Sequence, residues 1–392
     1  MEALSIFDAV DPALIERYGV TALAVGVLAA DDRAARGYGV GPETTFRIAS
    51  VTKPLVAATA MRLVEEDALV LDEPVTGLRL PWDDITLRYL LSHQAGLAHD
   101  WSKPLEEYGG GDDALLRLAE DEAVGGPVGP GRLFAYSNPG YWLAGALIAR
   151  AADMPFEEAV RTLVLQPLRM ERTGFAPVEP SVRSDLPYPR ARHPSGGLYS
   201  SVGDLVRFAA HLAGGPGPLS PDSLREMQTP QVEVAPDADY GVGLALTRGR
   251  GRPAIEHAGG VLGIRSQLLV LPEDGTAFAL LTNSDLGHFL VNRLLREVGL
   301  ALSLPPEETV NGDDLAAVSG TFREPLGTTV RVAPRDGGIE ASLVGGDESS
   351  YLRPASSTRF VVRDGNEKGT WAEFFEDGRL MRYRNILFER AS

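Results

Sequence analysis

The spacing of apolar and polar residues divides the first part of the chain into short, distinct elements. Residues 11–17 have the spacing of a helix, and residues 21–28 form a continuous apolar run typical of a buried strand. Residues 34–39 are predicted to pair with that run as the second strand of a hairpin. A helical pattern follows over residues 51–68, directly after Ser50. The sequence thus predicts a strand pair followed by a helix with Ser50 at its N-terminus.

Farther along, residues 65–215 are mostly helical, with connecting loops rich in glycine and proline. Strand patterns return at residues 240–247, 265–271 and 276–283, and a helical pattern covers residues 286–302. Strands at both ends with helices between them favour one sheet built from the two ends of this stretch. We therefore predict an α/β fold of the α+β type, in which helices flank an antiparallel sheet and form a helical subdomain.

The pattern changes after residue 304. Residues 305–312 begin with a proline-rich, acidic stretch and are predicted to be a linker between a domain at 1–304 and a second one at 313–392. The second domain contains short strand-like runs separated by turn residues, which predicts a small all-β barrel or sandwich. These runs lie at residues 320–323, 330–333, 339–343, 359–363, 371–375 and 380–388.

Composition excludes several classes of function. The net charge is −17 and no basic stripe is present, which argues against nucleic-acid binding. No run of about 18 apolar residues occurs, and the first residues carry acids where a signal peptide has a basic start. Cysteine is absent, which rules out disulfides and cysteine nucleophiles. We expect a cytoplasmic protein without a membrane partner.

Lysine is rare in this chain, and one lysine stands in a chemically suggestive place. Of the 37 basic residues only Lys53, Lys103 and Lys368 are lysine. An ammonium group can lose its proton on burial, whereas a guanidinium cannot. Lys53 lies three residues after Ser50, so on a helix its amine can accept the proton of the Ser50 hydroxyl. The Ser-x-x-Lys spacing alone often arises by chance. The other two lysines, Lys103 and Lys368, are expected to be ordinary surface residues.

Two further segments carry polar groups suited to the same chemistry. Tyr136 and Asn138 follow a loop and precede an apolar helix, where a tyrosine beside an ammonium can act as a base and an amide can orient a carbonyl. A loop with an ordinary helix cap is the alternative interpretation. Farther on, His257 precedes Ala258, Gly259 and Gly260, small residues that let a substrate approach closely.

The amide of Gly260 could donate to an oxyanion, and His257 could join a proton relay or bind a carboxylate. A single histidine before a turn is more often structural.

The combination and order of these segments resemble the three motifs of class C β-lactamases and their penicillin-binding relatives. The segments are Phe-Arg-Ile-Ala-Ser-Val-Thr-Lys at 46–53, Tyr-Ser-Asn at 136–138 and His-Ala-Gly at 257–259. Further similarity lies at Leu-Leu-Ser-His-Gln-Ala-Gly-Leu (90–97), at 196–201 and at 240–244. The resemblance covers about residues 20–300. Several β-lactamase-like peptidases and esterases also carry a lipocalin-like barrel, whose usual opening residues 318–322 resemble.

The resemblance implies a serine hydrolase that passes through an acyl-enzyme. Ser50 would attack a carbonyl, Lys53 and Tyr136 would move its proton, and Asn138 would hold the acyl side of the substrate. The oxyanion would bind the Ser50 and Gly260 amides, with Gly259 beside them. No cofactor or metal is implied.

His-Ala-Gly stands where true β-lactamases of this class have Lys-Thr-Gly. This resembles carboxylesterases and D-aminopeptidases, so we expect little or no β-lactamase activity. The expected substrates are small esters, amides or peptides, including those with D-residues, with esters slightly ahead.

Three alternatives remain open at this stage. The same chemistry could serve acyl transfer or peptide cyclisation. The fold could also persist as an inactive binding domain, although degenerate members usually lose one of the residues that are filled here. A metallohydrolase is disfavoured because the six histidines form no His-Glu-x-x-His pattern. Oligomeric state and the role of the barrel are not decided by the sequence.

Overall fold

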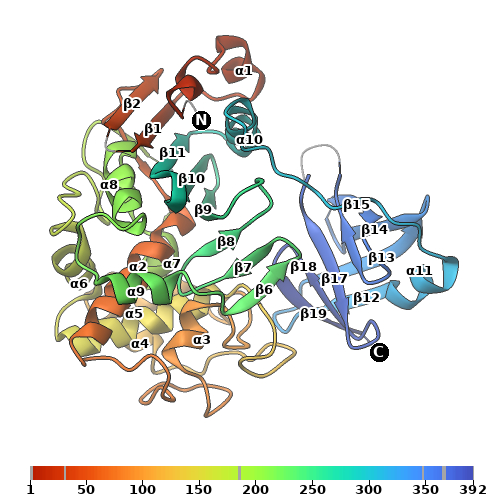
Figure 1. The fold of residues 1–392 in the computed structure, drawn as a ribbon. Helices are drawn as coiled ribbons and strands as arrows, with labels where there is room; N and C mark the ends of the chain where they lie inside the picture. Colours follow the sequence, from red (N-terminus) through yellow and green to blue (C-terminus); the bar gives the residue numbers. More distant parts are fainter. Residues whose placement is uncertain (1–2, 31, 184–186, 347, 364–367, 392) are drawn as a thin grey trace.

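The computed structural model describes residues 3–30, 32–183, 187–346, 348–363 and 368–391. Its larger part combines a mixed set of helices with one antiparallel sheet, and its smaller part is a separate barrel (Figure 1). The sheet has the strand order β2-β1-β11-β10-β9-β8-β7-β6. Its strands are β1 (Leu23–Ala29), β2 (Asp32–Tyr38), β6 (Val232–Ala235), β7 (Ala238–Tyr240), β8 (Ala245–Thr247), β9 (Ala254–Val261), β10 (Ile264–Leu271) and β11 (Thr276–Thr282).

The centre of this sheet joins the two ends of the larger domain. Strand β1 pairs with β11, with Val25 opposite Leu280, although the two residues lie more than 250 positions apart in sequence. All residues of β11 are buried, and β1 is buried up to its last residue. The prediction that both ends contribute to one sheet is therefore confirmed.

Two predictions about this sheet were wrong. The pattern at 240–247 is two strands, not one, because the chain turns through Gly243 at a φ of +79° so that Tyr240 pairs with Ala245. The residues 257–260, expected before a strand, lie within β9, which pairs with β10 along its length. Alanine and glycine lack the branched side chains that signal a strand in sequence, so β9 escaped notice.

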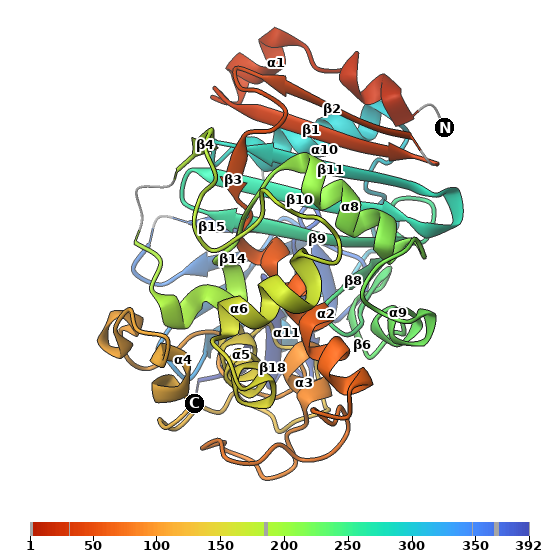
Figure 2. The same ribbon diagram turned by 90° about the vertical axis from the view of Figure 1, so that its left-hand side faces the viewer.

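Helices cover both faces of the sheet, as Figure 2 shows. On one face, α10 (Gly287–Glu297) and the 3-10 helix at Ala3–Phe7 pack on apolar residues of β1, β10 and β11. On the other face, α8 (Val202–Leu212) and α2 (Thr52–Glu65) belong to a larger core that continues into the helical subdomain. The remaining helices are α1 (Pro12–Arg17), α3 (Leu87–Leu91), α4 (Ala114–Leu118), α5 (Asn138–Ala152), α6 (Phe156–Val160), α7 (His193–Gly196) and α9 (Pro221–Met227).

A small three-stranded sheet, which the sequence analysis missed, leads into α2. It contains β3 (Thr45–Arg47), β4 (Ser181–Val182) and β5 (Tyr199–Ser200), with β3 in the centre. Strands of two or three residues are too short to show a sequence period. Their consequence is large, because β3 ends immediately before the segment that carries Ser50.

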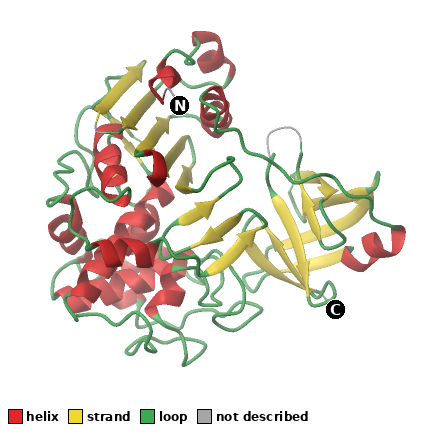
Figure 3. Cartoon of the chain, viewed as in Figure 1, coloured by secondary structure: helices red, strands yellow, loops and turns green. Residues whose placement is uncertain are grey.

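The C-terminal part is a closed eight-stranded barrel preceded by α11 (Gly312–Val318), as the colouring by secondary structure makes clear (Figure 3). Its strands are β12 (Gly320–Arg323), β13 (Thr329–Arg335), β14 (Gly338–Leu343), β15 (Ser349–Pro354), β16 (Arg359–Val361), β17 (Trp371–Phe375), β18 (Leu380–Tyr383) and β19 (Ile386–Arg390). Apolar side chains fill its interior. The prediction of a small all-β barrel is confirmed.

The barrel contacts the larger domain through both polar and apolar groups. Arg382 of β18 donates to the backbone carbonyl of Glu233 in β6 at 3.0 Å and also forms a buried ion pair with Glu373. The backbone carbonyl of Asn385, in the turn between β18 and β19, accepts the backbone N–H of Tyr136 at 2.9 Å. The barrel is therefore bonded directly to a segment singled out for its chemistry. Among the described helices, none is long and apolar enough to cross a membrane.

Candidate active site

Ser50 lies in a tight turn between β3 and α2. The turn is a single 3-10 turn at Ala49–Val51, and the regular helix begins at Thr52, one residue later than the sequence pattern indicated. Ala49 has a positive φ of 45°, which is strained for a residue with a Cβ atom. The turn is held at Ile48, whose carbonyl accepts the Ser266 hydroxyl of β10 at 2.7 Å. The fold thus holds a partly exposed Ser50 at a strained bend.

Lys53 is fully buried one helical turn away, and its amine has three hydrogen-bond partners. Nζ lies 3.2 Å from Ser50 Oγ, 2.9 Å from Asn138 Oδ1 and 2.8 Å from the carbonyl oxygen of Ser195. No carboxylate contributes to its electrostatic environment, and burial alone lowers the pKa of Lys53 well below its usual value.

The three partners fit either form of the amine, because an ammonium can donate to all three and a neutral amine can donate to two and accept from the third. A neutral amine has two N–H groups and one lone pair, and the amide oxygen of Asn138 and the carbonyl of Ser195 can only accept hydrogen bonds. In the neutral form, which burial favours, the lone pair falls to the third partner, the Ser50 hydroxyl, which can donate. The arrangement can accept a proton from Ser50.

Tyr136 lies on the other side of the Ser50 hydroxyl. Ser50 hydrogen-bonds the Tyr136 hydroxyl, and Lys53 Nζ lies 4.8 Å from the centre of the tyrosine ring. Burial raises the pKa of Tyr136. The interpretation of Tyr136 as partly phenoxide is thus disfavoured, because a neutral Lys53 supplies no positive charge to offset that burial. A neutral phenol can still relay a proton, since it both donates and accepts.

Strand β9 passes along the backbone of the Ser50 turn. Gly259 is buried, and a Cβ atom there would lie 2.3 Å from the Ile48 carbonyl oxygen and 3.1 Å from the Ser50 amide nitrogen. Only glycine allows so close an approach. The next residue, Gly260, is exposed, and a Cβ atom there would meet only the side chain of Arg265 at 3.4 Å or beyond. The close contact therefore belongs to Gly259, and Gly260 faces the open side.

His257 is buried and both of its ring nitrogens are occupied. Nδ1 lies 2.8 Å from the carbonyl oxygen of Ala258, which can only accept, so Nδ1 carries the proton. Nε2 must then accept the hydroxyl of Tyr240 at 3.1 Å. Burial is the largest cause that lowers the pKa of His257 to about 3. The sequence analysis allowed His257 to bind a carboxylate; with this lowered pKa, His257 is uncharged near neutral pH and offers no charge to a carboxylate.

The structure brings the predicted residues Ser50, Lys53, Tyr136 and Asn138 together by direct contacts. It adds Ser195, Tyr240 and His93, which were not singled out. Tyr240 is the first residue of the supporting motif at 240–244, and Ser195 directly precedes the one at 196–201. Position in a recurring motif was therefore the only sequence signal available for these residues.

A cleft of about 740 Å³ opens beside this cluster between the larger domain and the barrel. Tyr136, His257 and Gly260 line it from the catalytic side, and Gly369 and Asn385 line it from the barrel side. Its charged residues come largely in opposite pairs, such as Arg250 with Glu256 at 3.3 Å. Within the described part of the chain, no group of three metal-ligating side chains is placed to hold an ion.

Comparison with known proteins places this geometry in a family. The model of the Beta-lactamase family matches residues 7–303. The chain belongs to this family. Penicillin-binding protein 4 of Amycolatopsis lactamdurans is 28% identical over 337 residues, covering 73% of this chain and 86% of that protein. Esterase EstB of Burkholderia gladioli is 31% identical over 265 residues, covering 53% of this chain and 65% of the esterase.

Similarity to a solved structure extends over the barrel as well. A crystal structure of SurE with D-Leu is 25% identical and has a TM-score of 0.77, with 99% of this chain and 98% of SurE covered. The combination of larger domain and barrel is therefore shared with a whole solved chain. The relatives of this chain are serine hydrolases, among them an esterase and a D-aminopeptidase.

Proposed function

We propose that the protein is a serine hydrolase that forms an acyl-enzyme at Ser50 and acts on small esters, amides or peptides. The observation that carries the proposal is the fully buried amine of Lys53, which lies 3.2 Å from the Ser50 hydroxyl and whose pKa burial lowers. A lysine kept neutral by burial has little structural use, whereas a neutral amine beside a serine is a base beside a nucleophile. The complete cluster also argues against an inactive binding domain.

The proposed reaction has two balanced halves. In the first, Ser50 Oγ attacks the substrate carbonyl carbon while Lys53 Nζ takes the hydroxyl proton, and the oxyanion binds the amides of Ser50 and Gly260. The proton then passes through Tyr136 to the leaving alcohol or amine as its bond to carbon breaks. In the second half, water attacks the acyl-enzyme, gives up a proton to the same groups and releases the acid and Ser50. Asn138 orients the acyl side of the substrate and holds Lys53.

The neutral state of His257 supports a choice of substrate class. A cation at this place in β9 would attract a substrate carboxylate, but His257 is uncharged above a pKa of about 3 and both of its nitrogens are occupied. Substrates without a carboxylate at this position, such as esters and amides, fit better than penicillins or cephalosporins. The similarity to EstB supports esters, and the similarity to SurE solved with D-Leu supports D-residues. We place esters slightly ahead.

Acyl transfer to an amine or alcohol is a second candidate. The cleft of about 740 Å³ favours it, because a nucleophile larger than water needs room beside the acyl-enzyme. Adding an amine acceptor to the ester assay distinguishes the two candidates: an acyltransferase forms the amide in preference to the acid, and a hydrolase does not.

The proposal is tested with p-nitrophenyl esters, D- and L-amino-acid amides and benzylpenicillin, with kcat/KM measured for each. Ser50→Ala should abolish turnover of every active substrate and leave the melting temperature nearly unchanged. Ser102→Ala, which changes an exposed serine, is the matched control and should behave as the unaltered protein. Substantial ester turnover by Ser50→Ala overturns the proposal, and a kcat/KM for benzylpenicillin equal to that of the best ester overturns the substrate class.

A further inference from the structure

His93, in the motif at 90–97, has no part in the proposed reaction, yet its surroundings are those of the active site. The side chain is almost fully buried, at 1% exposure, and the backbone has a positive φ of 59°. Its ring lies 4.1 Å from the ring of Tyr136, centre to centre, and 4.9 Å from that of Tyr240, which holds His257. It also lies 5.3 Å from the ring of Tyr141, over which Lys53 sits.

His93 also hydrogen-bonds the segment that carries Tyr136 and Asn138. Its carbonyl oxygen accepts the N–H of Ala135 at 2.9 Å, and its Nδ1 accepts the N–H of Ser137 at 3.1 Å. These two bonds flank Tyr136. Because Nδ1 accepts, the ring proton is on Nε2, and this buried atom has no hydrogen-bond partner in the described structure. A polar atom buried without a partner destabilises the folded protein, so an ordinary packing role would be better served by an apolar ring.

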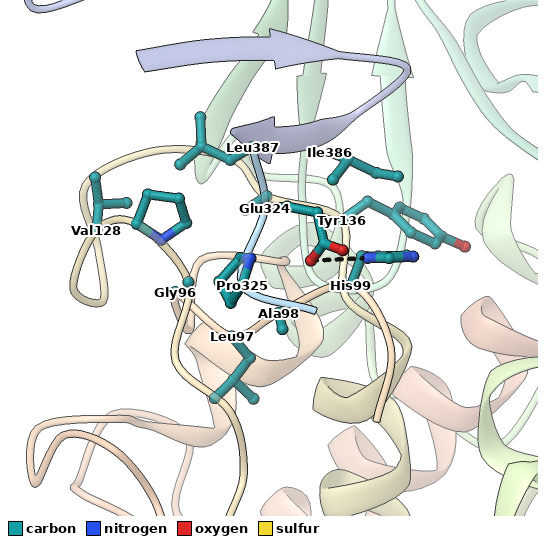
Figure 4. Close-up of a pocket in the computed structure, with 13 residues that line it drawn as sticks. Gly96, Leu97, Ala98, His99, Val128, Tyr136, Glu324, Pro325, Ile386 and Leu387 are labelled. Atoms are coloured by element: carbon teal, nitrogen blue, oxygen red, sulfur yellow. Dashed lines mark ion pairs between the residues drawn. The ribbon is translucent and has the colours of Figure 1, made fainter. Parts of the chain in front are cut away.

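The residues that follow His93 extend this support along the same segment. The carbonyl oxygen of Ala98 accepts the Ser137 hydroxyl at 2.8 Å, and that of His99 accepts the N–H of Asn138 at 3.2 Å. Figure 4 shows the far side of this run, where the His99 ring lies beside Tyr136 and faces the Glu324 carboxylate of the barrel. His99 Nδ1 lies 3.6 Å from Glu324 Oε2 across that contact.

From these contacts we propose that His93 is a positioning residue, which fixes Tyr136 and Asn138 against Ser50 and Lys53 through its Nδ1 acceptor and its ring. This inference rests on the proposed function, since it assigns a role within the same site. His93 touches no reacting atom. It keeps the Tyr136 hydroxyl and the Asn138 amide at the distances that the proton transfer needs, where a small displacement is costly.

Two amide variants test the proposal because they place an acceptor differently. His93→Asn puts its oxygen near the place of Nδ1 and tolerates the positive φ, whereas His93→Gln extends its amide toward the place of Nε2. We expect His93→Gln to lower kcat for the best ester at least about 100-fold, as a small displacement of the catalytic groups can, with KM within a few-fold. His93→Asn should restore kcat to within about 10-fold of the unaltered protein.

Melting temperatures of both variants show whether each is folded under assay conditions. If His93→Gln does not fold, His93→Leu, which has the shape of asparagine without the acceptor, takes its place with the same expected loss. Wild-type kcat in His93→Gln or His93→Leu, or equal loss in His93→Asn, overturns the inference. Ser50→Ala in the same assay separates the two claims: if it stays active the proposed function fails, whereas an inactive Ser50→Ala beside a fully active His93→Gln refutes only the role of His93.

Discussion

At the residue scale, the three lysines of the chain separate cleanly by environment. Lys53 is fully buried, whereas Lys103 is half-exposed and pairs with Asp121 at 2.8 Å, and Lys368 is exposed in a turn. These positions agree with the prediction that Lys103 and Lys368 are surface residues and that Lys53 alone is a candidate base. A chain that otherwise uses arginine keeps a lysine where the charge can be lost.

Lys53→Arg tests whether loss of charge matters. Arginine keeps a positive charge but cannot act as a base, so we predict that kcat/KM for the best ester falls at least about 100-fold, as expected when a general base is removed. In the unaltered protein, kcat/KM should fall as acid protonates Lys53, and burial places this fall well below the usual pKa of a lysine. Measured pH profiles check both statements. Activity within a few-fold of the unaltered protein would reduce Lys53 to an electrostatic role.

The residues found from the sequence share one property. Ser50, Lys53, Tyr136 and Asn138 carry groups whose chemistry is visible in the residue type, and their order along the chain made them recognisable. His93 and the Ser195 carbonyl act through contacts that only the fold creates. The carboxylate-binding role considered for His257 is disfavoured because burial lowers its pKa, and burial cannot be seen in the local sequence.

At the scale of the element, β9 is the part of the site that sequence reasoning placed incorrectly. Its glycine and alanine residues hide the strand period, while the same small residues allow it to lie against the Ser50 turn. The hydrophobic strands β1, β10 and β11 were found, because buried central strands read as apolar runs. Elements that shape the site were thus harder to predict than those that build the core.

The two neighbouring glycines of β9 provide a matched pair. Gly259→Ala would place a methyl group 2.3 Å from both the Ile48 carbonyl oxygen and the Ser266 hydroxyl, so the strand must move away from Ser50. We predict at least about a 100-fold loss of kcat/KM, because the oxyanion amides separate. Gly260→Ala meets only the flexible Arg265 side chain and should retain activity within about 10-fold. Equal activity of the two variants, measured with the best ester, would contradict this account of β9.

At the scale of the whole molecule, the barrel contributes to the site by holding the Tyr136 backbone through Asn385. Arg382 is one of the residues that attach it, being buried with Glu373 and hydrogen-bonded to the Glu233 carbonyl. The sequence predicted a barrel but not its contacts, since surfaces that meet across domains leave no periodic pattern. The division between the domains at 304 and the linker at 305–312 stays a prediction.

A double substitution tests this attachment. Arg382→Met alone should lower the free energy of unfolding by about 3–5 kcal/mol, because it leaves the Glu373 carboxylate buried without the Arg382 guanidinium. Adding Glu373→Met should recover most of that loss, since a buried ion pair replaced by apolar groups is often neutral. The double variant still lacks the bond to Glu233, and we expect kcat/KM to fall about 10-fold through a displaced Asn385 turn.

Arg335→Met, at an exposed barrel position, is the control for this pair. Denaturant unfolding and ester kinetics measure the two effects separately. A double variant that is stable and fully active would show that the barrel attachment does not support the site.

The central claim is that Ser50 becomes acylated, and it is tested most directly by mapping a covalent adduct. The native protein is treated with a fluorophosphonate, digested, and analysed by mass spectrometry, beside Ser50→Ala and Lys53→Arg. The account predicts one adduct on Ser50, none in Ser50→Ala, and slowed labelling in Lys53→Arg. An adduct on another residue of the native protein, or undiminished labelling of Ser50→Ala, would contradict it.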